Sequence, residues 1–134
     1  MSNYFISYHH FDVDFATILE MRLEQAGLTV WKDDQRLIAG DDWRTAIDRG
    51  ISECLALLLV MTPEAKASEY VTYEWASAIG AGKKVVPLIL REVKLHPRLQ
   101  TIHYLNFSNP AARPWDKLFA ALEVPIPRPT LCDP

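Results

Sequence analysis

Two residues on a segment of helical periodicity carry the strongest chemical signal in the sequence. Tyr70 and Glu74 are four positions apart, so their side chains are neighbours if the segment is a helix. They flank an apolar stripe, which predicts that the stripe faces the core and that Glu74 lies at its margin, beside an aromatic ring. A carboxylate in such a place can stabilise a developing positive charge, whereas most glutamates on helices are solvated surface residues. The stripe consists of Val71, Trp75 and Ala78.

A second signal comes from the charged segment at residues 32–43. It is long for a connection between a strand and a helix, which usually takes about two to six residues. It contains charges of both signs and one aliphatic pair, Leu37 and Ile38, with no obvious place in the core. A charged loop with an apolar tip is typical of a segment that binds a ligand or a partner, and a solvated connection is the alternative.

Five apolar segments predict the strands that must position these residues. The third is a run of apolar residues without polar alternation, which is typical of a strand buried on both faces of a parallel sheet. Pro87 lies within the fourth, which predicts that this strand is near an edge or has a short neighbour. The five segments are residues 4–8, 28–31, 54–61, 84–90 and 101–107.

The segments between these strands predict helices, and the alternation indicates an α/β fold with a parallel sheet covered on both faces. Asp12 is the expected cap of the first helix, and Thr62 followed by proline is the expected cap of the third. Ser68 marks a restart of that helix and is expected to cap it rather than to act as a nucleophile. The predicted helices are residues 12–26, 43–53, 62–81 and 115–122.

The carboxyl ends of the strands are the expected location of a site. Ligands of open parallel sheets bind beyond these ends. Three connections meet there, namely residues 7–10, 32–43 and 62–74. The last of them leads to Glu74, which favours a functional role for this carboxylate over a purely solvated one.

Length and charge limit the classes of function. With 134 residues and a mass of 15.3 kDa, the chain has the size of one domain. Lys and Arg number 14 and Asp and Glu 17, so the net charge of −3 argues against a nucleic-acid binder with a basic face. The longest apolar run, residues 54–61, has eight residues, whereas a membrane helix needs about 20. We therefore expect a soluble, cytoplasmic domain with no direct nucleic-acid or membrane partner.

Other chemistries find no support in the sequence. The Gly-x-Gly-x-x-Gly motif of dehydrogenases is absent, and the glycines at positions 80 and 82 predict the end of a helix. A phosphate-accepting receiver domain needs acidic residues where this chain has His9 and His10. Because these two adjacent side chains are predicted to diverge on a strand, no metal site is expected there. Cys54 is predicted to be a small, buried apolar residue.

In their order along the chain, five short motifs, together with residues 47–52 before the third predicted strand, resemble those of the TIR domain, the Toll/interleukin-1 receptor module, in its bacterial form. The likeness extends from residue 4 to residue 122, which predicts a TIR domain over residues 1–124 and a Pro-rich tail or linker over residues 125–134. The motifs are Tyr-Phe-Ile-Ser-Tyr at 4–8, Val-Trp-Lys-Asp at 30–33, Leu-Ile-Ala-Gly-Asp-Asp-Trp at 37–43, Ser-Glu-Tyr-Val-Thr-Tyr-Glu at 68–74 and Lys-Val-Val-Pro-Leu-Ile at 84–89.

This resemblance implies a fold and a site. The implied fold is a flavodoxin-like three-layer sandwich, with a five-stranded parallel sheet of order 2-1-3-4-5 and helices on both faces. Residues 32–42 would be the BB loop of the family, and Leu37 and Ile38 the residues that assemble one copy with the next. In the NAD-cleaving branch the catalytic glutamate lies on the helix after the third strand, where this chain has Glu74, and NAD⁺ is the substrate rather than a cofactor. The implied substrate-binding residues are Ser7, His9, His10, Asp33, Arg36, Trp43, Ser68 and Tyr70.

The resemblance leaves two functions open. The first is an NAD⁺ nucleosidase that releases nicotinamide together with ADP-ribose or a cyclic isomer of it. One carboxylate suffices for this reaction, because nicotinamide departs as a neutral molecule and needs no general acid. Such an enzyme would be activated by self-assembly, filaments included, and would act in bacterial immune (anti-phage) signalling, fused to or regulated by a sensor domain. The second function is a non-catalytic TIR–TIR interaction or scaffold module.

Overall fold

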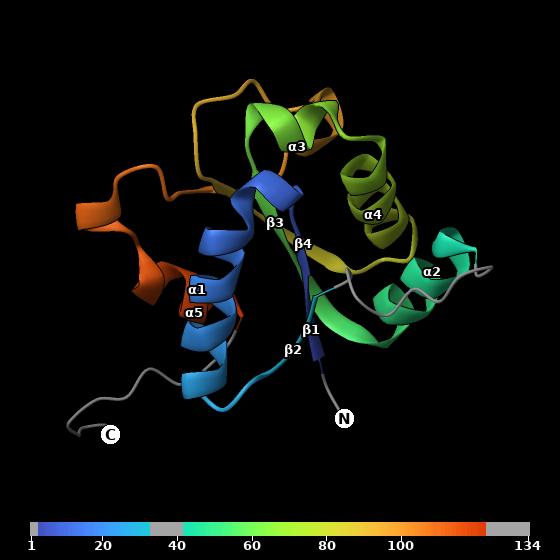
Figure 1. Cartoon of the computed structure of the whole chain (residues 1–134), viewed down its shortest axis with the longest axis horizontal. Coiled ribbons are helices and arrows are strands. Elements are labelled where there is room, and N and C mark those ends of the chain that lie inside the picture. The colour runs from blue at the N-terminus through green and yellow to red at the C-terminus, as the bar shows by residue number, and fades with distance from the viewer. Residues whose placement is uncertain (1–2, 33–41, 123–134) are drawn as a thin grey trace.

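The computed structural model describes residues 3–32 and 42–122, which form an α/β sandwich around one parallel sheet (Figure 1). The strand order is β2-β1-β3-β4-β5, and every neighbouring pair is parallel. The predicted order and orientation are therefore confirmed. The strands are β1 (Asn3–Ser7), β2 (Thr29–Lys32), β3 (Cys54–Met61), β4 (Lys84–Ile89) and β5 (Leu105–Asn106).

Helices cover both faces of the sheet. In Figure 1, α1 (Val13–Gln25) and α5 (Trp115–Ala121) lie on one side, and α2 (Trp43–Glu53) and α4 (Glu69–Gly80) lie on the other. The short α3 (Pro63–Ala67) lies over the end at which the strands finish. Single 3₁₀ turns complete the chain: η1 (His10–Asp12), η2 (Pro97–Leu99) and η3 (Pro110–Ala112). None of the helices in the described residues has the length and apolar character needed to cross a membrane.

Strand β3 is the centre of the core, as its unbroken apolar run predicts. Every residue of β3 is buried except Leu55. Because side chains alternate between the faces of a strand, Leu58 packs in the cluster under α1 and α5, while Leu57 packs in the cluster under α2 and α4. Each fully buried leucine contributes about 2 kcal/mol of hydrophobic free energy. Cys54, at the start of the strand, is buried as predicted, and burial raises the pKa of its thiol.

Two of the three predicted caps are confirmed, and the third is wrong. The Thr62 hydroxyl accepts the Ala65 N–H at 3.1 Å and begins α3, and the Ser68 hydroxyl accepts the Val71 N–H at 3.1 Å and begins α4. Asp12 occupies the cap position of α1, but its side chain accepts no backbone N–H there. The Asp12 carboxylate instead contacts Thr62 and Arg91.

The edge of the sheet beyond β4 confirms what Pro87 predicts. Strand β5 has two residues, which pair only with Leu88 and Ile89. Pro87 therefore has a short neighbouring strand. The predicted fifth strand is correct in place but too long, because residues 101–102 belong to a turn in which the Ile102 N–H donates to the Leu99 carbonyl.

One close contact ties β2 to α2. The ring of Trp31 lies 4.6 Å from the ring of Phe5, centroid to centroid, and packs against Gly50. A Cβ at position 50 would come within 2.3 Å of a ring atom of Trp31. Glycine at this helical position therefore allows the indole to lie against α2.

Candidate active site

The structure brings two of the predicted site residues together. Glu74 lies on α4, and Ser7 is the last residue of β1; both side chains are fully buried. Ser7 shares a face of β1 with Phe5, which packs in the cluster under α2 and α4, so its side chain points toward α4. The Ser7 hydroxyl donates a hydrogen bond to Oε1 of Glu74. This contact joins residues 67 positions apart at the carboxyl edge of the sheet.

The second oxygen of Glu74 has no such contact. Oε2 is buried, and no residue that the structure describes forms a hydrogen bond with it. The side chain also lies deeper than predicted, within the core rather than at its margin. A buried carboxylate destabilises a fold unless its oxygens are paired, and unpaired buried groups of this kind are concentrated at functional sites. Glu74 is therefore the leading candidate for a reactive group.

The helix that carries Glu74 is fixed at its start and along its inner face. Ser68 caps α4 through its hydroxyl oxygen, which accepts the Val71 N–H, and its implied role in substrate binding stays a prediction. Val71, Trp75 and Ala78 are all buried, which confirms the predicted stripe. Tyr70, on the turn before Glu74, is partly buried against the same core cluster. The side chain of Glu74 is thus presented by a rigid element.

His9 and His10 follow β1, but not as predicted. Strand β1 ends at Ser7, and the chain turns into η1, so the two imidazoles do not diverge. Their rings stack with centroids 4.2 Å apart, and Phe11 contacts each of them edge-on at 4.7 Å. His9 Nδ1 accepts the Phe11 N–H at 3.1 Å at the start of η1. The pair forms one aromatic surface beside the end of β1.

A polar network that the sequence did not reveal lies at the same edge of the sheet. Asp12 is 3% exposed, and its Oδ2 accepts the Thr62 hydroxyl at 2.8 Å. A guanidinium nitrogen of Arg91 lies 2.9 Å from Oδ1 of Asp12, in an ion pair that lacks hydrogen-bond alignment, and 2.6 Å from a Glu64 oxygen. The hydrogen bond between Arg91 and Glu64 lowers the pKa of Glu64 and raises that of Arg91. The network ties together the connections that follow β1, β3 and β4.

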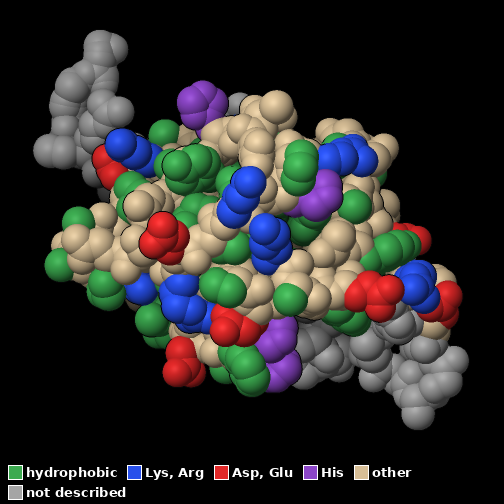
Figure 2. Space-filling model, turned by 90° about the horizontal axis from the view of Figure 1, so that it is seen from above, with side chains coloured by type: hydrophobic (Ala, Val, Ile, Leu, Met, Phe, Trp, Pro, Cys, Tyr) green, Lys and Arg blue, Asp and Glu red, His purple; other side chains and the backbone are tan. Residues whose placement is uncertain are grey.

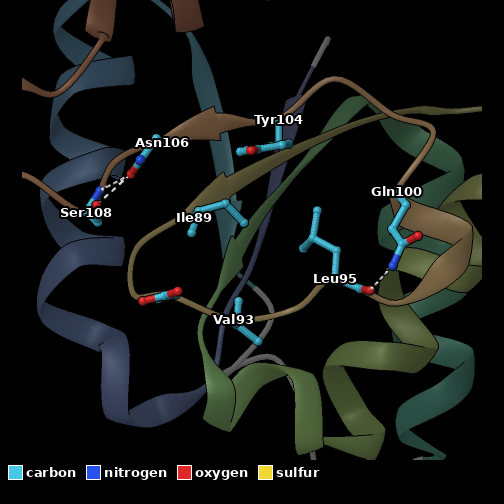
Figure 3. A pocket seen from close by; sticks show the side chains of 8 residues that line it. Ile89, Val93, Leu95, Gln100, Tyr104, Asn106 and Ser108 are labelled. Carbon is cyan, nitrogen blue, oxygen red and sulfur yellow. Dashed lines mark hydrogen bonds between the residues drawn. The ribbon is translucent and has the colours of Figure 1, made fainter.

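A separate pocket of about 480 Å³ lies at the carboxyl ends of β4 and β5 (Figure 3). Its walls combine aliphatic, amide and hydroxyl groups, and none of the predicted site residues lines it. The pocket and the Ser7–Glu74 contact are therefore two different features of the carboxyl edge of the sheet. The residues that line the pocket are Ile89, Glu92, Val93, Leu95, Gln100, Tyr104, Asn106 and Ser108.

The surface at this end carries mixed charge. Figure 2 looks down on the carboxyl ends of the strands and shows Lys and Arg side chains interspersed with Asp and Glu side chains. This agrees with the small net charge of −3.

Comparison with known families identifies this architecture. A family model described as "TIR domain" matches residues 5–122. The chain belongs to the TIR-domain family. Among curated proteins, this TIR domain is similar to the "Probable 2' cyclic ADP-D-ribose synthase BdTIR" of Brachypodium distachyon, with 31% identity over 91 residues. That match covers 65% of this chain and 41% of the relative, so the match spans about two fifths of the relative's length.

Solved structures with little sequence identity share the fold. The TIR domain of the Toll-related receptor TRR-2 from Hydra magnipapillata has a TM-score of 0.79 at 21% identity, over 90% of this chain and 97% of that one. A TIR-STING receptor from C. gigas has a TM-score of 0.71 at 22% identity, over 92% of this chain and 40% of that one. The CMP N-glycosidase BcmB of Clostridium botulinum has a TM-score of 0.67 at 20% identity, over 89% of this chain and 98% of that one. At these identities the likeness shows the fold alone.

Several predicted site residues of this TIR domain fall in or next to residues 32–42, the segment predicted to be the BB loop. Asp33, Arg36, Leu37 and Ile38 lie outside the described residues. The backbone of Trp43 begins α2, and its side chain is likewise outside the described part. Asp42, directly before it, caps the helix by accepting the Arg44 N–H at 3.1 Å. The roles assigned to these five residues stay predictions.

Proposed function

We propose that this TIR domain cleaves the nicotinamide–ribose bond of NAD⁺, with Glu74 as the catalytic residue. The observation that carries the proposal is the buried carboxylate of Glu74, which has one oxygen bonded to Ser7 and the other without a partner among the described residues. The printed name of the Brachypodium distachyon relative, a probable 2′ cyclic ADP-D-ribose synthase, supports the same class of substrate.

The chemistry needs only this one acidic group. In NAD⁺ the scissile bond joins ribose C1′ to a pyridinium nitrogen that already carries a positive charge. When the bond breaks, its electron pair leaves with nicotinamide, and the positive charge develops on the ribose. A carboxylate beside the ribose stabilises that charge, and its low-dielectric surroundings strengthen the interaction. Water then forms the new bond to C1′ and loses a proton, which gives ADP-ribose; attack by a hydroxyl of the same molecule instead gives a cyclic isomer.

The direct test is to incubate the purified domain with NAD⁺ and to separate nicotinamide from the nucleotide products by chromatography and mass spectrometry. Replacing Glu74 by Gln removes the charge while keeping the shape, so we expect turnover to fall by about 100-fold or more. Glu69→Gln is the matched control, because Glu69 is an exposed glutamate in the first turn of the same helix. Wild-type turnover in Glu74→Gln would refute the proposal.

We further propose that activity requires self-association. A head-to-tail contact between identical copies that does not close gives filaments, and Leu37 and Ile38 are the predicted contact residues. Charge reversal at this position, as in Leu37→Asp, is expected to lower assembly and turnover together, measured by light scattering and by nicotinamide release in the same samples. Loss of turnover with unchanged assembly would separate the two.

The proposed setting is bacterial antiviral signalling under the control of a sensor domain. It is tested by plating phage on bacteria that carry the full-length protein or its Glu74→Gln form. Protection by the first and not by the second is the expected result. Equal protection by both would contradict a catalytic role in defence.

A non-catalytic TIR–TIR interaction module is the second candidate. The complete burial of Glu74 favours it, because a carboxylate with no exposed surface could serve packing alone. This candidate predicts self-association without nicotinamide release, even in concentrated or clustered samples. Measuring nicotinamide release therefore distinguishes the two candidate functions.

A further inference from the structure

We infer that Ser7 is a positioning residue for Glu74 and not a contact for the substrate. Its hydroxyl holds Oε1 and thereby leaves Oε2 as the oxygen that meets the ribose. The inference rests on the proposed function, since it assigns to Ser7 a role in the same proposed active site as Glu74. It also changes the role that the family resemblance implies for Ser7.

The first argument is the supply of donors. A serine hydroxyl has one hydrogen to donate, and Ser7 donates it to Oε1 of Glu74. Ser7 is therefore committed to the carboxylate.

The second argument is the orientation of the carboxylate. The terminal torsion of a glutamate is broad, so the plane of its two oxygens is poorly fixed without a partner. A donor at Oε1 fixes that plane and makes the two oxygens inequivalent. Oε2 then points in one direction, without a hydrogen-bond partner among the described residues.

The third argument is the rigidity of the two elements that carry these side chains. Strand β1 is paired on both sides, with β2 through residues 3–6 and with β3 up to the pair Ser7–Leu59. Helix α4 is capped by Ser68 and packs through Val71 and Trp75. Groups held within about 0.5 Å by such elements provide the preorganised geometry that catalysis needs.

The fourth argument is the balance of charge. No Lys or Arg in the described ranges, 3–32 and 42–122, forms an ion pair with Glu74. The Ser7 hydroxyl is thus the only donor shown for this carboxylate within those residues. A neutral donor brings no positive charge of its own, so it does not compete with a cation that develops on the ribose beside this carboxylate.

The hydrogen bond is tested without any enzyme assay by a double-mutant cycle in thermal unfolding. Ser7→Ala is compared in two backgrounds, the wild type and Glu74→Met, in which the thioether is a poor acceptor. We expect Ser7→Ala to lower the unfolding temperature by roughly 5 °C in the wild type and by less than about 2 °C in the Glu74→Met background. Equal losses in the two backgrounds would overturn the inference.

Kinetics then separate positioning from substrate binding. We expect Ser7→Ala to lower kcat by about 10- to 100-fold while KM changes by less than about twofold. Ser7→Thr keeps the hydroxyl and is expected to restore much of kcat, and Ser52→Ala, an exposed serine of α2, is the control without effect.

Each outcome has a distinct meaning. A rise in KM with unchanged kcat in Ser7→Ala would make Ser7 a substrate contact and overturn the inference. Wild-type kinetics in Ser7→Ala would overturn it as well, while nicotinamide release by the wild-type protein would still support the proposed function. A wild-type protein without nicotinamide release would refute the proposed function whatever the unfolding cycle shows.

Discussion

Asp12 and Glu74 are both carboxylates buried at the carboxyl edge of the sheet, yet their oxygens are compensated very differently. Asp12 has the Thr62 hydroxyl on one oxygen and the Arg91 guanidinium beside the other. Glu74 has the Ser7 hydroxyl on one oxygen and, within the described residues, no partner on the other. The first carboxylate lies beside a cation, whereas the described residues place no cation beside the second.

This difference separates a structural acid from a reactive one. Asp12, paired with a cation and a hydroxyl, links the connections that follow β1, β3 and β4. Its charge is balanced within the fold and is not free to act on a ligand. An acid with a single neutral donor destabilises the fold slightly but can act on a positively charged group that enters the site. Stability and activity should therefore respond in opposite ways when the two acids are changed.

The largest expected effect on stability comes from Asp12→Ala. The substitution removes the acceptor for Thr62 and half of the ion pairing of Arg91, so we expect the free energy of unfolding to fall by about 2–3 kcal/mol. The Arg91 side chain is 48% exposed, which limits the loss because water replaces its partner. Chemical denaturation measures the change, and Asp14→Asn, which alters an exposed acid in the first turn of α1, is the control. A loss no larger than that of the control would remove the distinction between the two acids.

A smaller effect is expected from Thr62→Val. This change deletes the hydroxyl that donates to Asp12 and also accepts the Ala65 N–H at the start of α3. We expect a loss of about 1–2 kcal/mol in the free energy of unfolding. Thr45→Val, at an exposed position of α2, is the matched control. In the Asp12→Ala background the same change should have less effect, because the partner is already gone.

Glu74→Gln tests the other half of the comparison. Replacing an incompletely paired buried carboxylate by a neutral amide is expected to leave the free energy of unfolding unchanged or to raise it by up to about 1 kcal/mol, while turnover is lost. Denaturation of the variant beside Glu69→Gln measures this. A loss above about 2 kcal/mol would show that Glu74 serves the fold as Asp12 does.

The smallest effect is the pH dependence that arises from Glu64. Its pKa in the folded chain lies below its ordinary value of 4.5 because of the hydrogen bond from Arg91, so ionised Glu64 stabilises the fold at higher pH. That contribution is lost as the pH falls through the lowered pKa. Thermal unfolding between about pH 6 and pH 3 should therefore show a steeper decline for the wild type than for Glu64→Gln. Glu92→Gln, in which an exposed glutamate is changed, should follow the wild type.

Much of the fold could be predicted from the sequence because its determinants are local. The apolar run of β3, the cap residues Thr62 and Ser68, and the proline in β4 each act within a few residues of where they lie. The helical spacing of Val71, Trp75 and Ala78 predicted correctly which face of α4 is buried. These signals set the elements, their order and the edge at which a site forms.

Local sequence signals did not predict side-chain positions where the chain turns, or where a residue distant in sequence is the hydrogen-bond or ion-pair partner. The stacking of His9 on His10 depends on where β1 ends, and alternation along a strand could not show that. Asp12 was placed correctly as the first residue before α1, but its carboxylate leaves the helix end because Thr62 and Arg91 offer stronger partners.

What the sequence by itself determined was that Glu74 is an acid on the flank of a helix's apolar stripe, after the third strand of a parallel sheet. What only the tertiary structure decided was its environment: full burial, a hydroxyl from β1 on one oxygen, and no partner for the other among the described residues. The physical reason is that burial and pairing depend on groups far apart in the chain, here 67 residues, which meet only when strand and helix have packed.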